Sequence, residues 1–174
     1  MEIEFYGAAG MVTGSCHILR VNGHQVLLDC GLIQGGRKAE SRNRDPFPFD
    51  PARIDAVILS HAHLDHSGRL PLLVQRGFKG PVFTQNATRD LCDILLADAA
   101  SLAERDAEYH NRKRRRNNDE EMQPLFTRQD ADAAVARMTG LRYRETREIL
   151  PGIRLTYRDA GHILGSCIVA LDLE

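Results

Sequence analysis

The run Ala56-Val57-Ile58-Leu59-Ser60 is short, continuous and apolar, and it leads directly into His61-Ala62-His63-Leu64-Asp65-His66. A short apolar run with β-branched residues predicts a strand that is buried on both of its faces. The chain has only 7 histidines, yet three of them fall in this one segment. We therefore expect a buried strand whose carboxyl end opens into a loop, residues 61–68, that carries a concentrated set of metal-binding side chains.

The segments around this strand predict a layered α/β fold. Asn22-Gly23 separates residues 15–21 from residues 25–29 and predicts a β-hairpin, because both central positions of a type I′ turn need a positive φ. A helix at 70–75 and a strand at 81–83 complete a strand–loop–helix–strand order, which is typical of β/α layers. Residues 32–54 are rich in glycine, arginine and proline, which indicates an irregular surface connection near something functional.

The second half of the chain predicts two helices and three strands. Leu91, Leu95, Ala99 and Leu102 recur at helical spacing, so we expect one long amphipathic helix over residues 88–109 that buries these side chains. Thr127 and Asp130 have the spacing of a capping box and predict a helix that continues to Met138. The expected strands are residues 141–145, 153–157 and 167–173.

Composition narrows the class of protein. A chain of 174 residues allows one compact unit, and 23 basic against 24 acidic residues give no overall field that would attract nucleic acid or an anionic membrane. The acidic start Met1–Phe5 differs from a signal peptide, and no apolar run approaches the roughly 20 residues of a membrane helix. Without any CxxC pair, the cysteines are interpreted as core residues in a reducing cytoplasm: Cys16, Cys30, Cys92 and Cys167.

The histidine cluster predicts two adjacent metal sites. On a loop that leaves a strand, alternate residues point the same way, so His61 and His63 can approach one cation, while the following turn directs Asp65 and His66 toward another. Neutral imidazole and carboxylate are the usual ligands of zinc and similar ions. A loop of water-facing polar residues is the alternative explanation, and four such side chains directly after an apolar strand make it the weaker one.

Two distant residues are candidates for the same site. His162 lies between two expected strands in Ala160-Gly161-His162-Ile163-Leu164-Gly165-Ser166, where the glycines allow close backbone approach, and we expect it to complete a metal shell. Asp29 ends the second arm of the hairpin. Its two interpretations are a turn-forming aspartate and a carboxylate that holds the ligand loops in place.

These motifs resemble those of the metallo-β-lactamase fold. The HxHxDH run from His61 to His66, with Asp29 before it and His162 after it, is similar to the ligand pattern of that fold. The continuation Ser67-Gly68-Arg69-Leu70-Pro71, the opening from Phe5 to His17 and the segment 160–166 are similar to the β-CASP branch, which contains nucleases that process RNA and DNA. The resemblance implies an αββα sandwich, present here as its N-terminal part only, over residues 1–174.

The resemblance also implies a zinc-dependent phosphodiester hydrolase. One zinc would be bound by His61, His63 and His162 and a second by Asp65 and His66, with Asp65 and His66 as the catalytic residues and Asp29 behind the ligands. The substrate implied is RNA, with DNA as the alternative, attacked as an endonuclease or exonuclease in the cytoplasm. A later bridging aspartate, a later histidine and the β-CASP domain would lie outside this chain, so we expect weak binding of the second metal and poor cleavage by these residues alone.

Three other functions compete with this one. Thioester hydrolases and transfer-RNA 3′-processing enzymes of the same fold share the ligands, but a single residue, Ser67, between His66 and Gly68 favours β-CASP. A di-iron redox protein would carry glutamate at the position of His63, and a silent scaffold subunit of an RNA-processing complex would have lost ligands. The basic run 112–116, which is expected to follow the long helix, is either a solvated loop or a phosphate-binding edge beside the site.

Overall fold

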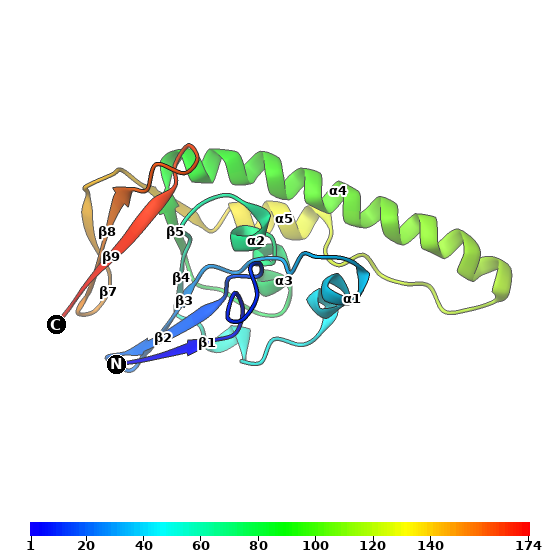
Figure 1. Cartoon of the computed structure of the whole chain (residues 1–174), viewed down its shortest axis with the longest axis horizontal. Helices are drawn as coiled ribbons and strands as arrows, with labels where there is room; N and C mark the ends of the chain where they lie inside the picture. Colours follow the sequence, from blue (N-terminus) through cyan, green and yellow to red (C-terminus); the bar gives the residue numbers. More distant parts are fainter.

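The computed structural model describes all 174 residues, and its strands form two sheets (Figure 1). One sheet has six strands in the order β1-β2-β3-β4-β5-β6, and the other has three in the order β7-β8-β9. In the larger sheet β1, β2 and β3 are antiparallel, whereas β3 to β6 run parallel. The strands are β1 Glu2–Phe5, β2 His17–Val21, β3 His24–Leu28, β4 Ala56–Ile58, β5 Val82–Gln85, β6 Met138–Leu141, β7 Thr146–Leu150, β8 Ile153–Asp159 and β9 Cys167–Leu173.

Helices cover one face of the larger sheet and the smaller sheet covers the other. The expected α/β layered architecture is thereby confirmed, with three layers of the sandwich in these residues: helices, sheet and sheet. The helices are α1 Arg37–Glu40, α2 Leu64–Ser67, α3 Leu70–Gln75, α4 Asn86–Asn117 and α5 Arg128–Val135, and the 3₁₀ turns are η1 Ser41–Arg44 and η2 Pro51–Arg53. No helix is both long enough and apolar enough to cross a membrane.

Alternation along each strand explains the two cores. Leu27, Val57 and Val82 stand side by side in register on β3, β4 and β5, and all three belong to the core beneath the helices. Ile58 and Phe83 alternate with them and point into the core between the two sheets. The central strands are therefore buried on both faces, as the run 56–60 predicts, and their side chains are apolar on both faces for this reason.

The hairpin is confirmed. Asn22 and Gly23 have φ values of 53° and 79°, as a type I′ turn requires, and they join β2 to β3. The helix at 70–75 and the strand at 167–173 also lie where the sequence places them.

Two segments that were predicted to be loops contain helical turns. Residues 61–68 contain the one-turn helix α2, so Asp65 and His66 are helical, and Ser67 Oγ donates to the backbone oxygens of Ala62 and His63 inside this turn. Residues 32–54 contain α1, η1 and η2 and include buried side chains such as Asn43 and Phe47. Asn43 holds this segment because it exchanges two hydrogen bonds of 2.8 Å with the backbone of Ile33.

The long helix α4 differs from the prediction in length and in orientation. It continues to Asn117, so the basic run lies inside the helix, and 24–28 residues separate it from Thr88, which contacts the His162 loop. At 1.5 Å per residue this places the run about 40 Å from that loop instead of beside it. The buried face is Thr88, Cys92, Leu96, Ala99 and Ala100, whereas Leu91 and Leu95 lie at its border and Leu102 is exposed.

The prediction for the segment between α5 and β8 is also wrong in part. Helix α5 ends at Val135, and Met138 begins β6, which pairs in parallel with β5. Of the expected strand 141–145, only Leu141 lies in a strand, as the last residue of β6, and the remainder is a turn with Arg144 at a φ of 64°. Strand β7 was not expected because Thr146, Arg147 and Glu148 are exposed and interrupt the apolar pattern.

Candidate metal centre

The candidate site lies at the carboxyl ends of β3 and β4, where parallel strands place their following loops at one edge of the sheet. Asp29 follows β3, and His61 comes shortly after β4. The loop between β8 and β9 brings His162 to the same edge, because the backbone N–H of Cys167 donates to the oxygen of Ser60 at 2.9 Å. Three segments that are far apart in the sequence therefore meet at one point.

Three histidines converge in a geometry that fits one metal ion. His63 Nδ1 lies 3.2 Å from His61 Nε2 and 3.2 Å from His162 Nε2, and the three nitrogens all lie within 4.8 Å of one another. Metal–nitrogen bonds of the length found for zinc, in a tetrahedral arrangement, separate two ligand nitrogens by about 3.3 Å. Three imidazole nitrogens that face a common point form a donor set of the kind that binds divalent transition metals.

Asp65 and His66 form a second pair of donors beside the first set. His66 Nε2 lies 3.6 Å from Asp65 Oδ2, and the His66 ring centroid is 4.1 Å from that of His61. The other ring nitrogen, Nδ1, is 2.7 Å from Asp29 Oδ2, so Nε2 is directed away from Asp29 toward the Asp65 carboxylate. A nitrogen and a carboxylate oxygen are thereby available for a second cation next to the three histidines.

Asp29 is the centre of the hydrogen-bond network behind these residues. Its carboxylate accepts hydrogen bonds from the Ser60 backbone N–H (2.8 Å), the Ser60 hydroxyl (3.0 Å) and the Ser15 hydroxyl (3.2 Å), besides the contact with His66. The side chain is buried, and the backbone has a φ of 57°, a left-handed conformation that aspartate tolerates better than most residues. Asp29 thus fixes both the loop after β4 and the orientation of the His66 ring.

Ser60 and Ser15 carry part of this network and were not singled out from the sequence. Ser60 Oγ lies 3.0 Å from His61 Nδ1, which leaves His61 Nε2 free to face the other histidines. The signal that could have identified Ser60 is a hydroxyl side chain between a buried strand and the first histidine. Ser15 carries no comparable signal, because only the register of β2 and β3 brings it to Asp29.

Burial and neighbouring charges shift the pKa values of two of these histidines. Burial, reinforced by the charge of His66, lowers the pKa of His61 to about 4, so its imidazole is neutral at pH 7, as a metal ligand must be. For His66, burial acts to lower the pKa, but the hydrogen bond to Asp29 and the charges of Asp29 and Asp65 outweigh it and raise the pKa. His17 lies near Asp29 and His66, and burial lowers its pKa.

Two glycines permit the close approach of the loops. A Cβ at Gly31 would lie 1.6 Å from the backbone oxygen of Asp65, so only glycine lets the segment after β3 pass under α2. At Gly165 a Cβ would lie 2.5 Å from the backbone nitrogen of Thr88, and the φ of 81° also requires glycine. Backbone hydrogen bonds from Ser15 to Asp65 (2.9 Å) and from Leu32 to Leu64 (2.7 Å) hold the same segments together.

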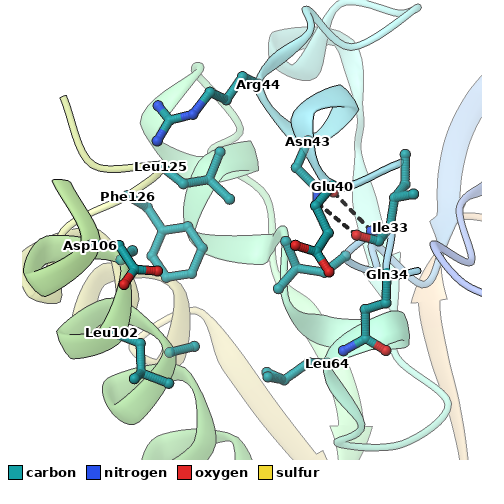
Figure 2. Close-up of a pocket in the computed structure, with 13 residues that line it drawn as sticks. Ile33, Gln34, Glu40, Asn43, Arg44, Leu64, Leu102, Asp106, Leu125 and Phe126 are labelled. Atoms are coloured by element: carbon teal, nitrogen blue, oxygen red, sulfur yellow. Dashed lines mark hydrogen bonds between the residues drawn. The ribbon is translucent and has the colours of Figure 1, made fainter. Parts of the chain in front are cut away.

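A hollow of about 340 Å³ includes Leu64 of α2 in its lining (Figure 2). Leu64, which lies between His63 and Asp65 in the sequence, points into it, opposite Phe126 and Leu102 of the helical layer. Its walls are mostly apolar, and the carboxylates of Glu40 and Asp106 approach it from opposite sides. None of the candidate metal ligands lines this hollow.

Comparison with known proteins identifies the family. The sequence profile of the metallo-beta-lactamase superfamily matches residues 9–161. This range contains Asp29 and the whole His61–His66 segment, and it ends one residue before His162. The chain belongs to the metallo-β-lactamase superfamily.

Two relatives show which branch of the superfamily the chain resembles. The chain is 41% identical over 174 residues to ribonuclease TTHA0252 of Thermus thermophilus, covering 100% of this chain and 36% of that protein. It is 38% identical over 165 residues to transcription termination factor FttA of Methanothermobacter thermautotrophicus, covering 91% of this chain and 23% of the relative. The chain therefore spans about a third or less of the length of these relatives, and the resemblance to the β-CASP branch is confirmed.

A solved structure supports the fold. The flavoprotein TM0755 of Thermotoga maritima superposes with a TM-score of 0.57 over 90% of this chain and 30% of its own, at 16% sequence identity. At this identity the likeness concerns the fold alone. The di-iron redox alternative, which the sequence disfavours because residue 63 is histidine and not glutamate, thus gains no support from a shared architecture.

Proposed function

We propose that this chain carries the metal-binding part of a zinc-dependent phosphodiester hydrolase that acts on nucleic acid, with RNA as its substrate. The single observation that carries the proposal is the convergence of His61 Nε2, His63 Nδ1 and His162 Nε2, with the Asp65–His66 pair beside them. The ribonuclease name of a relative that is 41% identical over the whole chain supports RNA as the substrate.

In the proposed mechanism each residue has a defined task. His61, His63 and His162 would hold one zinc, and Asp65 with His66 Nε2 would contribute to a second. Bound zinc lowers the pKa of water toward ~7 and stabilises negative charge on the phosphoryl oxygens. Asp65 would also orient the attacking water and accept its proton, while the bond from phosphorus to the leaving oxygen breaks. Asp29 accepts the Nδ1–H of His66 and so keeps Nε2 in its metal-binding tautomer.

Metal content per chain tests the proposed site. After purification without added zinc, we expect near-stoichiometric zinc in the wild type and little or none in a His61→Ala, His63→Ala double variant. A matched His24→Ala, His110→Ala variant removes two histidines outside the site and should keep its metal. Equal metal content in all three proteins would overturn the proposed site.

Cleavage of a labelled single-stranded RNA tests the proposed reaction. Hydrolysis that requires zinc and is lost in Asp65→Asn supports the phosphodiesterase. Because we also propose that the residues of this chain bind the second metal only weakly, we expect slow cleavage by the chain alone. Fast cleavage together with two tightly bound zinc ions would refute that part of the proposal, and stoichiometric zinc without any cleavage would favour a metal-binding scaffold.

A further inference from the structure

The last turns of α4 form a basic surface that the proposed metal centre does not use. They project beyond both sheets, and the chain that returns from them, residues 118–127, extends along the same side (Figure 1). Helix α4 continues to Asn117, and Asn118, with a φ of 62°, provides the left-handed cap. These turns therefore remain a helix of defined geometry, about 40 Å from the His162 loop.

The charges on these turns are separated onto two faces. Arg115 pairs with Glu108 at 3.2 Å and with Glu121 at 2.7 Å, and Arg114 donates to the backbone oxygen of Glu120 at 2.8 Å. The carboxylates of Glu108 and Glu121 are thus paired with Arg115, whereas Asp119 lines a neighbouring hollow with His110 and Lys113. Lys113 and Arg116 form no ion pair.

The other face carries cations together with an exposed aromatic ring. Tyr109, Arg112, Lys113 and Arg116 are spaced at i, i+3, i+4 and i+7, so they share one side of the helix. With His110 they line a hollow of about 430 Å³ that no carboxylate reaches. Arg112 has one long contact of 3.8 Å with Glu108, and its side chain is still 72% exposed.

The aromatic residues favour one kind of polyanion over others. Tyr109 is 72% exposed, and its ring packs edge-on against His110 with the centroids 5.5 Å apart. Cations alone would suit any acidic partner, whereas an exposed ring among them offers a base a surface on which to stack. Arginine and lysine at a spacing of one helical turn can contact successive phosphates of a flexible strand.

We propose that this basic face, consisting of Tyr109, His110, Arg112, Lys113 and Arg116, binds single-stranded nucleic acid at a distance from the metal centre. The inference rests on the proposed function, because it assigns the face to the substrate of that site. Phosphates contact the three cations and a base stacks on Tyr109. A strand held there and at the metal centre would be anchored at two points along α4.

Salt-dependent binding tests the ionic part of the inference. A fluorescently labelled single-stranded RNA of about 20 nucleotides is titrated with the 174-residue chain in EDTA, so that no cleavage occurs. A variant with Arg112→Gln, Lys113→Gln and Arg116→Gln should bind at least about 10-fold more weakly near 0.1 M salt, and the slope of log K against log salt should become shallower by about 2. The control Arg89→Gln, Arg105→Gln, Arg128→Gln removes the same charge elsewhere, and circular dichroism verifies that both variants are folded.

Substitution of Tyr109 tests the aromatic part. Tyr109→Ala should weaken binding of the single strand by about 5-fold or more and leave the salt slope unchanged, because stacking releases no counterions. Tyr109→Phe should retain the affinity. A duplex of the same sequence offers no unstacked base, so Tyr109→Ala should not change its binding.

Other results of these titrations would each refute a specific part of this inference or of the proposed function. Equal losses in the basic-face variant and its control would mean that only net charge matters, and the face would not be a site. Equal binding of polyglutamate, with no effect of Tyr109→Ala on RNA, would assign the face to an acidic protein and refute nucleic acid. The titration needs neither metal nor cleavage, so it separates the two proposals. If an inactive chain binds RNA through the basic face, only the proposed hydrolase is refuted. If the chain cleaves RNA and the basic-face variant binds it as well as the wild type does, only this inference is refuted.

Discussion

Asp29 shows how one side chain fixes several candidate metal-binding groups at the residue scale. Its carboxylate accepts hydrogen bonds from the backbone N–H and the hydroxyl of Ser60, from the Ser15 hydroxyl and from the His66 ring. The substitution Asp29→Asn therefore removes a negative charge and replaces one acceptor oxygen by a donor. Asparagine tolerates the φ of 57°, so the backbone is expected to stay as it is. We expect zinc affinity to fall about 10–100-fold and the free energy of unfolding without metal to fall by about 1–3 kcal/mol.

A chelator competition titration measures the affinity, and urea unfolding in EDTA measures the stability. Asp172→Asn on β9, an exposed position, serves as the control and should change neither quantity. Unchanged zinc affinity in Asp29→Asn would show that Asp29 is a turn residue without influence on the ligands.

Helix α5 offers a prediction at the element scale that is independent of the metal centre. Its capping box is complete: Thr127 Oγ1 accepts from the Asp130 backbone N–H at 3.3 Å, and Asp130 Oδ2 accepts from the Thr127 N–H at 2.8 Å. Thr127→Ala should therefore reduce the free energy of unfolding by about 1 kcal/mol without changing metal content. Urea denaturation checks this, and Thr127→Ser should retain most of the stability; an equal loss in both variants would point to the lost methyl group instead of the cap.

Elements with a strong local signal were predictable, and those set by packing were not. The hairpin and the capping box of α5 follow from short-range chemistry at Asn22-Gly23 and Thr127. Helix α4 has two adjacent apolar stripes, one through Leu91 and Leu95 and one through Cys92 and Leu96, and periodicity alone does not decide which one is buried. The sheet selects the second stripe, partly because Thr88 Oγ1 donates to the oxygen of Gly165 at 2.7 Å.

The residues of the candidate site also divide into those that a local sequence signal predicts and those that only packing places there. His61, His63, Asp65 and His66 are neighbours in the sequence, so their clustering was visible before any fold was known. The one-turn helix α2 that separates their directions was not visible, because it depends on contacts of Asp65 with the segment before β2 and of Leu64 with the segment after β3. Ser15 was missed for the same reason.

At the scale of the whole molecule, the three histidines join its two sheets. His61 and His63 follow β4 of the larger sheet, whereas His162 precedes β9 of the smaller one. A metal ion on all three would therefore cross-link the two layers and bind only the folded chain. Zinc at about 100 times its dissociation constant should stabilise the fold by about 2.7 kcal/mol, which corresponds to a rise in Tm of roughly 5–10 °C for a chain of this size.

Thermal unfolding with EDTA and with a range of zinc concentrations measures this rise. His162→Ala separates the cross-link from general stability: its side chain is exposed, so the variant should keep the Tm of the wild type in EDTA and lose most of the rise with zinc. His24→Ala, also remote from the candidate ligands, should keep both. The cross-link argument fails if zinc raises the Tm of His162→Ala as much as that of the wild type, because the metal would then be held by one loop and the two sheets would be joined by their apolar core alone.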